Sequence, residues 1–364
     1  MAAVILGFMN ARVTASPPLA YVQGHFANAT GTPAISTSGG RFDNGACFTS
    51  SNTGTNIAAF PHNEAVIDTG DLGTNYIDGA FTGSIATGSS ANGNWCLAIG
   101  DTGVGAQFTI RVDFVSKLID VWRGTSTGTS LASSVNCPLL SNVANSHSII
   151  AVGWSIDNTT GFIWIRINGT VYVNLTGIDT QNTANAHWNR ANIGACSTNN
   201  IFSKTDHPVL WHLNAAAVTT LPVDARVAYG QPTGDNGSPQ FTRNTGASNA
   251  SAVDDGLVDG DTTYNSSTTV GHVDKFDVSA TWIPNNTTSI YAVQSYTVSR
   301  IDDATPRTRK TTIHSGASAT DGATINEQSS YRSYVSRCDN DPATAVPWVL
   351  AALQAADISY TLVS

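Results

Sequence analysis

The stretch Phe162-Ile-Trp-Ile-Arg-Ile-Asn-Gly-Thr-Val-Tyr-Val-Asn-Leu175 decides the fold class of this chain. It holds two runs in which apolar and polar residues alternate, on either side of the dipeptide Asn168-Gly169. Alternation with a period of two is typical of a half-buried strand, and Asn-Gly tolerates the positive φ angles of a type I′ turn. The stretch therefore predicts a β-hairpin with arms at residues 162–167 and 170–175.

More strands are expected on the N-terminal side of this hairpin. Residues 148–156 predict a strand, and the turn at 157–161 would join them to the hairpin as a three-stranded meander. Residues 107–114 and 118–122 predict a second hairpin. Many antiparallel strands in one stretch of chain favour a β-sandwich, which we place at residues 1–221.

The pattern changes after residue 221. Residues 222–259 are rich in turn-forming residues and are expected to be a linker or junction. Residues 260–364 predict a small β-rich domain with one short helix. Its expected elements are a strand at 289–300, a turn at 302–306, a return strand at 307–314, a strand at 331–336, a helix at 345–356 and a closing strand at 358–363.

Charge and hydropathy exclude several classes of protein. The net charge of -9 and the isoelectric point of about 5.2 argue against a broad electrostatic grip on nucleic acid or anionic lipid. The apolar opening, residues 1–9, is too short to span a membrane and lacks the basic region of a signal peptide, so we expect a first strand there. No nucleic-acid partner, membrane insertion or secretion is expected.

The five cysteines are sparse, and none forms a C-x-x-C pair that would indicate zinc or a redox motif. They are expected to be unpaired thiols buried as small hydrophobic residues.

Carboxylates do not form a convincing catalytic pair. The only two glutamates, Glu64 and Glu327, fall in separate domains, whereas retaining glycosidases need two carboxyl groups about 5 Å apart. Asp113 and Asp120, on the two arms of one hairpin, are the nearest substitute, and we interpret them as solvent-face acids beside Arg111 and Arg123. The sequence also lacks a G-x-S-x-G nucleophile elbow and a glycine-rich phosphate loop. We therefore expect no enzyme activity and no catalytic residues.

The sequence evidence for a metal or anion site is equally weak. His207 and His212 have a spacing that suits neither one helix face nor one strand face. Asp254, Asp255, Asp259 and Asp261 form an oxygen-rich segment that either holds calcium or makes ordinary Asx turns. No other cofactor is expected. The basic cluster of Arg300, Arg307, Arg309 and Lys310 lies on two arms of one expected hairpin, with Asp302 and Asp303 at its turn, which favours local charge pairing over a phosphate site.

Two tryptophans are candidates for contact with a glycan or a partner. Trp122, Trp154 and Trp164 lie in expected strands and are assigned to the core. Trp188 and Trp211 lie outside them and are expected at an exposed surface, where indole rings stack on sugars.

The segments Gly39–Phe48, Ile119–Thr125 and Asp157–Asn182, with the Asn-Gly hairpin inside the last, resemble the concanavalin-A-like, laminin-G-like jelly-roll domains of tailed-bacteriophage virion proteins. This resemblance covers residues 4 to about 220. The second half resembles the segment that often follows that jelly roll. The matching parts are Val258–Ser267, Asp274–Asp277, Ala292–Asp303, and Asp341–Thr344 with Trp348. Thr205–Trp211 departs from the family pattern, because only Asp206 remains where the family tends to carry several acids. That departure weakens a calcium site at the jelly-roll rim.

The resemblance implies a non-catalytic virion protein, assembled in the bacterial cytoplasm as part of a tail fibre, tail tip or head surface. Its expected partners are other virion proteins, further copies of itself in a trimer, and a glycan of the host surface. Two alternatives stay open: an architectural capsid decoration or cement protein without a receptor, and a carbohydrate-active enzyme on the same fold. The sequence alone does not separate head from tail.

Overall fold

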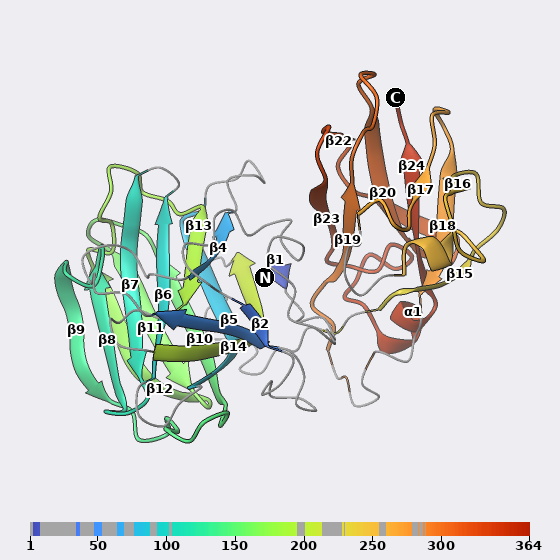
Figure 1. Cartoon of the computed structure of the whole chain (residues 1–364). Helices are drawn as coiled ribbons and strands as arrows, with labels where there is room; N and C mark the ends of the chain where they lie inside the picture. Colours follow the sequence, from blue (N-terminus) through green and yellow to red (C-terminus); the bar gives the residue numbers. More distant parts are fainter. Residues whose placement is uncertain are drawn as a thin grey trace. The chain divides into compact units, whose positions relative to one another are not determined.

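The computed structural model describes residues 3–7, 34–36, 47–52, 64–68, 76–87, 93–101, 104–194, 201–212, 228, 230–254, 260–278, 283, 287 and 289–364. The chain divides into two units, Met1–Val227 and Ala228–Ser364 (Figure 1). Both consist mainly of antiparallel strands, as the sequence predicts.

The first unit contains an eight-stranded antiparallel sheet, here called sheet A. Its strands are β1 (Ala3–Gly7), β2 (Ala34–Ser36), β3 (Cys47–Asn52), β5 (Asp78–Thr87), β10 (Ser148–Ser155), β11 (Gly161–Ile167), β12 (Thr170–Ile178) and β14 (Ile201–His212). They pair in the order β12-β11-β10-β5-β14-β3-β2, and β1 pairs with β14. The expected first strand at the N-terminus is confirmed by β1, which joins a strand about 200 residues away in sequence.

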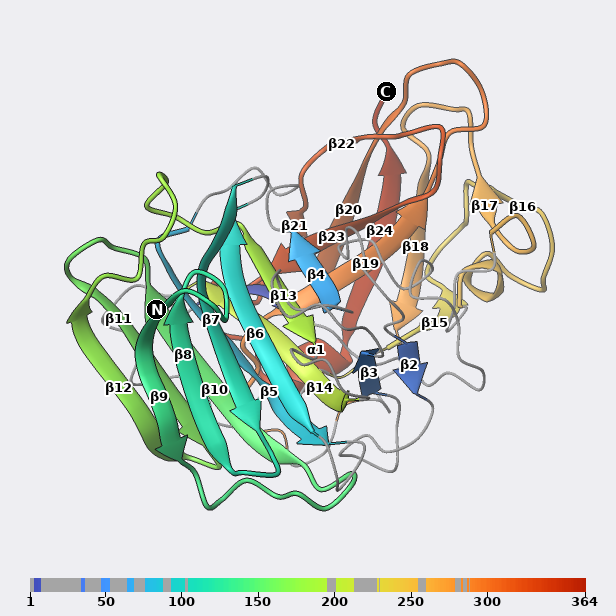
Figure 2. The ribbon, with the colours of Figure 1, turned by 60° about the vertical axis from the view of Figure 1, so that its left-hand side comes forward.

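A six-stranded antiparallel sheet, sheet B, forms the second layer of this unit (Figure 2). It contains β4 (Glu64–Asp68), β6 (Asn94–Asp101), β7 (Gly105–Asp113), β8 (Leu118–Arg123), β9 (Thr129–Asn136) and β13 (Arg190–Gly194). They pair in the order β4-β13-β6-β7-β8-β9. The chain crosses repeatedly between the two sheets, which gives the antiparallel jelly-roll sandwich that the sequence predicts.

The core of the sandwich lies between the two sheets. Phe81 of sheet A packs on Trp95 of sheet B with ring centroids 5.6 Å apart, and Phe108 of sheet B packs on Trp154 of sheet A at 5.7 Å. All four rings are fully buried. One face of each sheet meets this core, and the central strands β5 and β6 are buried along almost their whole length.

The hairpin that decides the fold class is confirmed. β11 and β12 pair around Asn168 (φ 49°) and Gly169 (φ 84°), so both turn residues have the positive φ angles of a type I′ turn. β10 pairs with β11 to complete the meander, and β7 pairs with β8 as the second predicted hairpin.

The second unit is a smaller β-rich body. Its six-stranded sheet contains β15 (Pro232–Asp235), β18 (Val273–Val278), β20 (Thr308–Ser315), β21 (Ser318–Asp321), β22 (Ile325–Asn326) and β24 (Ala356–Leu362). Two further strand pairs are β16 (Thr242–Arg243) with β17 (Asn265–Ser266), and β19 (Val293–Ser299) with β23 (Arg332–Cys338). The unit also holds the 3-10 helix η4 (Ala250–Ala252) and one α-helix, α1 (Leu350–Gln354). Its core includes Ile313, Cys338, Trp348 and Leu353.

Two expectations for the second unit are wrong in detail. The strands near 289–300 and 307–314 exist as β19 and β20, yet they do not form a hairpin: β19 pairs with β23, while β20 pairs with β24, β21 and β22. Local alternation indicates where a strand begins and ends, but the strand with which it pairs depends on contacts between residues far apart in sequence. The expected helix at 345–356 is shorter, because Ala345 has a positive φ of 57° and Ala356 already begins β24.

The boundary between the units lies at Val227 and Ala228. Residues 228–259, which fall in the expected junction, belong to the second unit, and β15 there pairs with β18. One buried carboxylate, Asp274, holds this segment in place. Asp274 accepts hydrogen bonds from the backbone N–H groups of Gln240 (2.8 Å) and Phe241 (2.9 Å) and from Asn249 Nδ2 (2.7 Å).

The cysteines differ from the prediction at one position. Cys137 and Cys338 are free and buried, as expected. Cys96 is disulfide-bonded, so the prediction that the cysteines are unpaired is wrong there. Separation along the sequence does not keep two thiols apart once distant strands pair.

Candidate functional site

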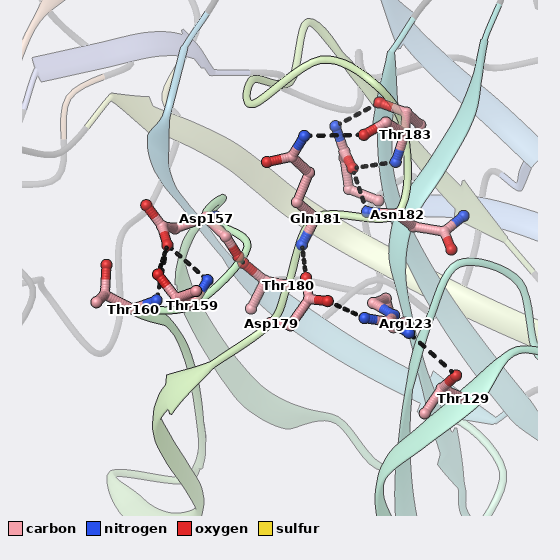
Figure 3. A network of polar contacts seen from close by, with 11 residues as sticks. Arg123, Thr129, Asp157, Thr159, Thr160, Asp179, Thr180, Gln181, Asn182 and Thr183 are labelled. Carbon is pink, nitrogen blue, oxygen red and sulfur yellow. Dashed lines mark hydrogen bonds and ion pairs between the residues drawn. The ribbon is translucent and has the colours of Figure 1, made fainter.

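Three polar loops meet at one end of the sandwich. They are residues 123–129 after β8, residues 157–160 after β10, and residues 179–187 after β12, and we call them the rim loops. Loop 179–187 lies between the other two and contacts both, as Figure 3 shows. Their exposed side chains are hydroxyls and amides, among them Thr127, Asn158, Thr159, Thr160 and Asn182.

Thr180 joins loop 157–160 to loop 179–187. Its buried hydroxyl donates to the carbonyl oxygen of Ser155 (2.6 Å) and accepts from the backbone N–H of Asp157 (2.9 Å). The backbone N–H of Thr180 in turn donates to the Asp157 carbonyl oxygen at 2.9 Å. These bonds fix the two loops side by side.

Gln107, on β7, anchors the other half of loop 179–187. Its fully buried side-chain Nε2 donates to Thr183 Oγ1 (2.9 Å) and to the carbonyl oxygens of Asn185 (2.7 Å) and His187 (2.8 Å). Its Oε1 accepts from the backbone N–H groups of Asn182 (2.8 Å) and Thr183 (3.1 Å). The two hydrogens of Nε2 are shared among three acceptors, so one side chain contacts five polar groups of the loop and holds it without any regular strand pairing.

The charges of the rim loops are few. Arg123 forms an ion pair with Asp179 and also contacts Thr129 (Figure 3). Asp157 Oδ1 accepts from the backbone N–H groups of Thr159 and Thr160, both at 2.7 Å, and from Thr159 Oγ1 at 3.1 Å. The backbone N–H groups of Thr160 and Thr159 lower the pKa of Asp157 to about 2, so this carboxylate stays ionised at neutral pH.

Trp188 and Trp211 are both buried, so the expectation of exposed rings is wrong for each. Trp188 packs against Trp154 at 5.2 Å and Tyr76 at 5.4 Å, and its backbone bridges to Tyr76. Trp211 lies within the 12-residue strand β14, between β5 and β1, and its Nε1 donates to Thr82 Oγ1 at 2.8 Å. Neither ring can stack on a sugar.

The expectation that Trp122 lies in the core is also wrong. It was assigned to the core with Trp154 and Trp164, which are buried, but Trp122 is partly exposed on the outer face of sheet B. Arg111 lies over its ring at 5.2 Å. The alternation in β8 carried the signal, because Trp122 shares a face with Asp120, while Ile119 and Val121 face the core.

The two aspartates considered as a catalytic pair have separate structural roles. Asp120 is buried and accepts from Arg111 Nε (3.1 Å), Arg111 Nη2 (2.6 Å) and the backbone N–H of Ser134 (2.8 Å). The contact with Arg111 was expected, whereas the expectation that Asp120 lies on a solvent face is wrong, because its side chain is buried. Asp113 accepts from the backbone N–H groups of Val115 and Ser116 and so caps the β7–β8 turn.

The basic cluster of the second unit is charge-paired. Arg307 pairs with Asp303 as the turn composition suggested, whereas Arg300 pairs with Asp261, Arg309 with Glu327, and Lys310 with Asp321. Arg309 and Glu327 are buried, and Arg309 Nη2 also donates to Thr297 Oγ1 at 2.7 Å. Charge pairing within this cluster is therefore confirmed, but the local partner is right only for Arg307, because the other three side chains pair with acids outside the expected hairpin.

The candidate calcium segment is described only in part. Asp261 accepts from Tyr331 Oη (2.6 Å) and Arg300 Nη2 (2.8 Å), whereas Asp255 and Asp259 lie outside the described residues, as do the side chains of His207 and His212. Within the described ranges, no group of three or more His, Cys, Asp or Glu side chains could hold a metal ion. No helix in the described part of the chain is long and apolar enough to cross a membrane.

Comparisons with known proteins return structural likenesses alone. No protein-family model matches the sequence, and no curated protein matches it. Among solved structures, alginate lyase Aly36B is 15% identical over 57% of this chain and 96% of its own, with a TM-score of 0.35.

The carbohydrate-binding module CBM66 from Bacillus subtilis is 10% identical over 50% of this chain and 95% of its own, with a TM-score of 0.30. The ancestral congerin Con-anc is 13% identical over 40% of this chain and 98% of its own, with a TM-score of 0.28. All three TM-scores are below 0.5, so the function is argued from the residues of this chain.

Proposed function

We propose that this chain is a non-catalytic structural protein of a bacteriophage virion, a tail fibre, tail-tip or head-surface component, and that its sandwich contacts the surface of the bacterial host. Two lines of support point the same way. The ordered pair of sequence segments, before and after residue 221, resembles the phage jelly roll and its companion. The first unit is a jelly-roll sandwich.

The observation that carries host contact is the construction of the rim loops. Buried Gln107 and Thr180 use their hydrogen-bonding groups to hold loop 179–187, while Thr127 and Asn158 are exposed. A fixed scaffold that presents mobile or variable polar residues at its loops is the usual design of a recognition surface. Fixing the loops beforehand also lowers the entropic cost of binding.

The proposal includes assembly in the bacterial cytoplasm with other virion proteins and with further copies of this chain, a trimer being favoured by analogy with phage fibres. Light scattering on the purified chain would measure its mass, and 38.0 kDa is the mass of a monomer.

Two measurements test the function together. Antibodies against the chain should label intact particles by immunogold electron microscopy, and the fluorescently labelled chain should bind cells of the host strain. Labelled particles without cell binding would support the cement role instead. Unlabelled particles would refute the virion proposal. Release of reducing ends from surface polysaccharide would refute the non-catalytic part.

A further inference from the structure

We propose that the turn Asn236-Gly237 of the second unit is a site of spontaneous deamidation, at which the side-chain amide of Asn236 is hydrolysed to aspartate and isoaspartate. The co-reactants are water and hydroxide ion, so the modification needs no enzyme. Asparagine is a chemically labile residue type, and heat-adapted proteins carry fewer of it. The inference is independent of the proposed function, because it concerns the chemistry of one turn.

The sequence contains four Asn-Gly pairs, which begin at Asn44, Asn92, Asn168 and Asn236. In such a pair the backbone nitrogen of the glycine can attack the amide carbon of the asparagine, because glycine has no Cβ atom and adopts many backbone conformations. The structure describes both residues of the pairs at 168 and 236, while Asn44 and Asn92 lie outside the described residues. The two described pairs differ in how firmly the amide is held.

The amide of Asn236 is held only through its nitrogen. Asn236 follows β15 directly, and its backbone N–H donates to the Lys275 carbonyl oxygen at 2.8 Å. Its Nδ2 donates to Asp277 Oδ1 at 2.7 Å, and within the described part of the chain no hydrogen bond reaches its Oδ1. Gly237 is exposed with a φ of 90°, and a Cβ atom there would have no neighbour within 4 Å. The surroundings of this turn therefore leave the glycine nitrogen room to approach the amide carbon.

The reaction consists of two steps. Hydroxide removes the proton from the Gly237 nitrogen, which attacks Cγ of Asn236, so that the N–Cγ bond forms and the Cγ–Nδ2 bond breaks. The departing Nδ2 takes a proton from water and leaves as ammonia. One water molecule then opens the cyclic imide and gives aspartate or isoaspartate. Because Nδ2 gains positive charge as it is protonated, the Asp277 carboxylate at 2.7 Å stabilises the leaving group.

The pair Asn168-Gly169 provides a matched control within the same chain. Asn168 Oδ1 accepts from the backbone N–H of Ile149 at 2.8 Å, and Asn168 Nδ2 donates to the Leu139 carbonyl oxygen at 3.5 Å. Both ends of this amide are therefore held, and Gly169 lies between the paired strands β11 and β12. Rotation of the amide toward the Gly169 nitrogen would break these bonds, so we expect slow deamidation at Asn168.

Deamidation of Asn236 replaces a hydrogen-bonded amide by a second carboxylate beside Asp277, and the two like charges repel each other. Lys275, the neighbouring cation on β18, is already paired with Asp357 at 3.0 Å. Isoaspartate also adds a methylene group to the main chain and so changes the path of the turn after β15. Because β15 is an outer strand of its sheet, either product loosens that edge.

The experiment incubates the folded full chain in mildly alkaline buffer and follows the two Asn-Gly pairs over time by peptide mass spectrometry. We expect Asn236 to deamidate about tenfold faster than Asn168, the ratio that corresponds to the hydrogen bonds that must break at Asn168. In concentrated urea, where these contacts are lost, the two sites should react at equal rates. Equal rates in the folded chain, or a faster reaction at Asn168, would overturn the proposal.

Three variants test the role of Asp277 and the effect of the product. Asp277→Asn keeps an accepting oxygen and removes the charge, so deamidation of Asn236 should slow about three- to tenfold. Asp113→Asn removes one charge from the first unit and should leave this rate unchanged. Asn236→Asp reproduces one product and should lower the melting temperature of the second unit by about 2–5 °C. An equal or faster reaction in Asp277→Asn would refute the assistance by Asp277, and an unchanged melting temperature would refute the loosened edge.

Discussion

Gly153 on β10 offers the sharpest test of how the sandwich is packed. A Cβ atom at this position would lie 2.3 Å from Trp164 Cε2, 2.4 Å from Nε1 and 2.5 Å from Cζ2. Gly153 and Trp164 are directly opposite in the register of β10 and β11, so the indole lies flat across the glycine. On its other side the ring contacts the Arg166 guanidinium, 4.7 Å from the centroid. The substitution that tests this contact is Gly153→Ala.

The expected cost follows from these distances. Carbon atoms in ordinary contact are about 3.5–4.0 Å apart, so the indole must retreat by more than ~1 Å. Trp164 is only 6% exposed, which leaves it little room. Overpacking of this kind costs about 1–3 kcal/mol, and complete expulsion of the ring would approach the ~3–5 kcal/mol of a buried Trp→Ala change. We expect Gly153→Ala to destabilise the first unit by about 1–3 kcal/mol.

A double-mutant cycle separates this clash from a backbone effect. Urea unfolding followed by circular dichroism would compare Gly153→Ala, Trp164→Ala and the double variant. Without the indole the new methyl group has free space, so Gly153→Ala should cost less than about 0.5 kcal/mol in the Trp164→Ala background. Gly234→Ala is the control, because its Cβ would meet only Asp277 Oδ2, at an ordinary 3.6 Å. An equal loss in both backgrounds, or no loss in either, would refute the packing argument.

Three further predictions concern the turn, the rim and the second unit. Gly169→Val should lower stability by about 1–3 kcal/mol, because Gly169 has a φ of 84°, and an unchanged melting temperature would contradict this. Gln107→Ala should speed amide exchange in residues 182–187 and cost about 1–3 kcal/mol, and Gln107→Glu should not rescue it, because a carboxylate cannot donate to the Asn185 and His187 carbonyls. Burial and the charge of Lys275 lower the pKa of His314 below the usual histidine value of 6.5, against the opposing charges of Asp357 and Asp321. The folded second unit therefore binds this proton less readily than the unfolded chain, so its melting temperature should fall as the pH drops below 6.5, and His314→Gln should reduce that slope.

The alternation of apolar and polar residues was sufficient to predict the hairpins, in which the two paired strands are neighbours in sequence. The hairpin around Asn168 and Gly169 could be predicted because its turn chemistry, its register and its alternation lie within 14 consecutive residues. β7 and β8 were predictable for the same reason. The pairing of β19 with β23 was not, because the two strands are about 33 residues apart and nothing in either strand specifies the other.

At the candidate site, the burial of Trp211 and the anchoring of loop 179–187 depend on contacts between residues far apart in sequence. Trp211 looked exposed from its neighbours, but β1, at the other end of the unit, covers its strand on one side. Gln107 gave no sequence signal as a loop anchor, because its five partners lie 75 to 80 residues away. Alternation alone did carry one overlooked signal, the outward position of Trp122 beside Asp120. Strand parity thus places Trp122 on the outward face, although Trp164, which shares a face of β11 with Arg166, is only 6% exposed.

Sheet edges decide how copies of this chain can associate. Charged residues can guard few strand edges in this chain, since only four lysines are present, and unguarded edges favour pairing with another copy. Among the described strands, β9 and β12 are edge strands whose pairing with their neighbours is irregular. The register of β9 with β8 shifts around Asp120. The register of β12 with β11 shifts between Ile165 and Arg166. In the second unit the outer strands β15 and β21 have four residues each. Bulges and short strands both block strand addition, so edges that carry few charges are still protected. If copies associate as proposed, we therefore expect contacts other than strand addition at β9 and β12, and amide exchange in these two strands should be the same in the free chain and in the proposed particle.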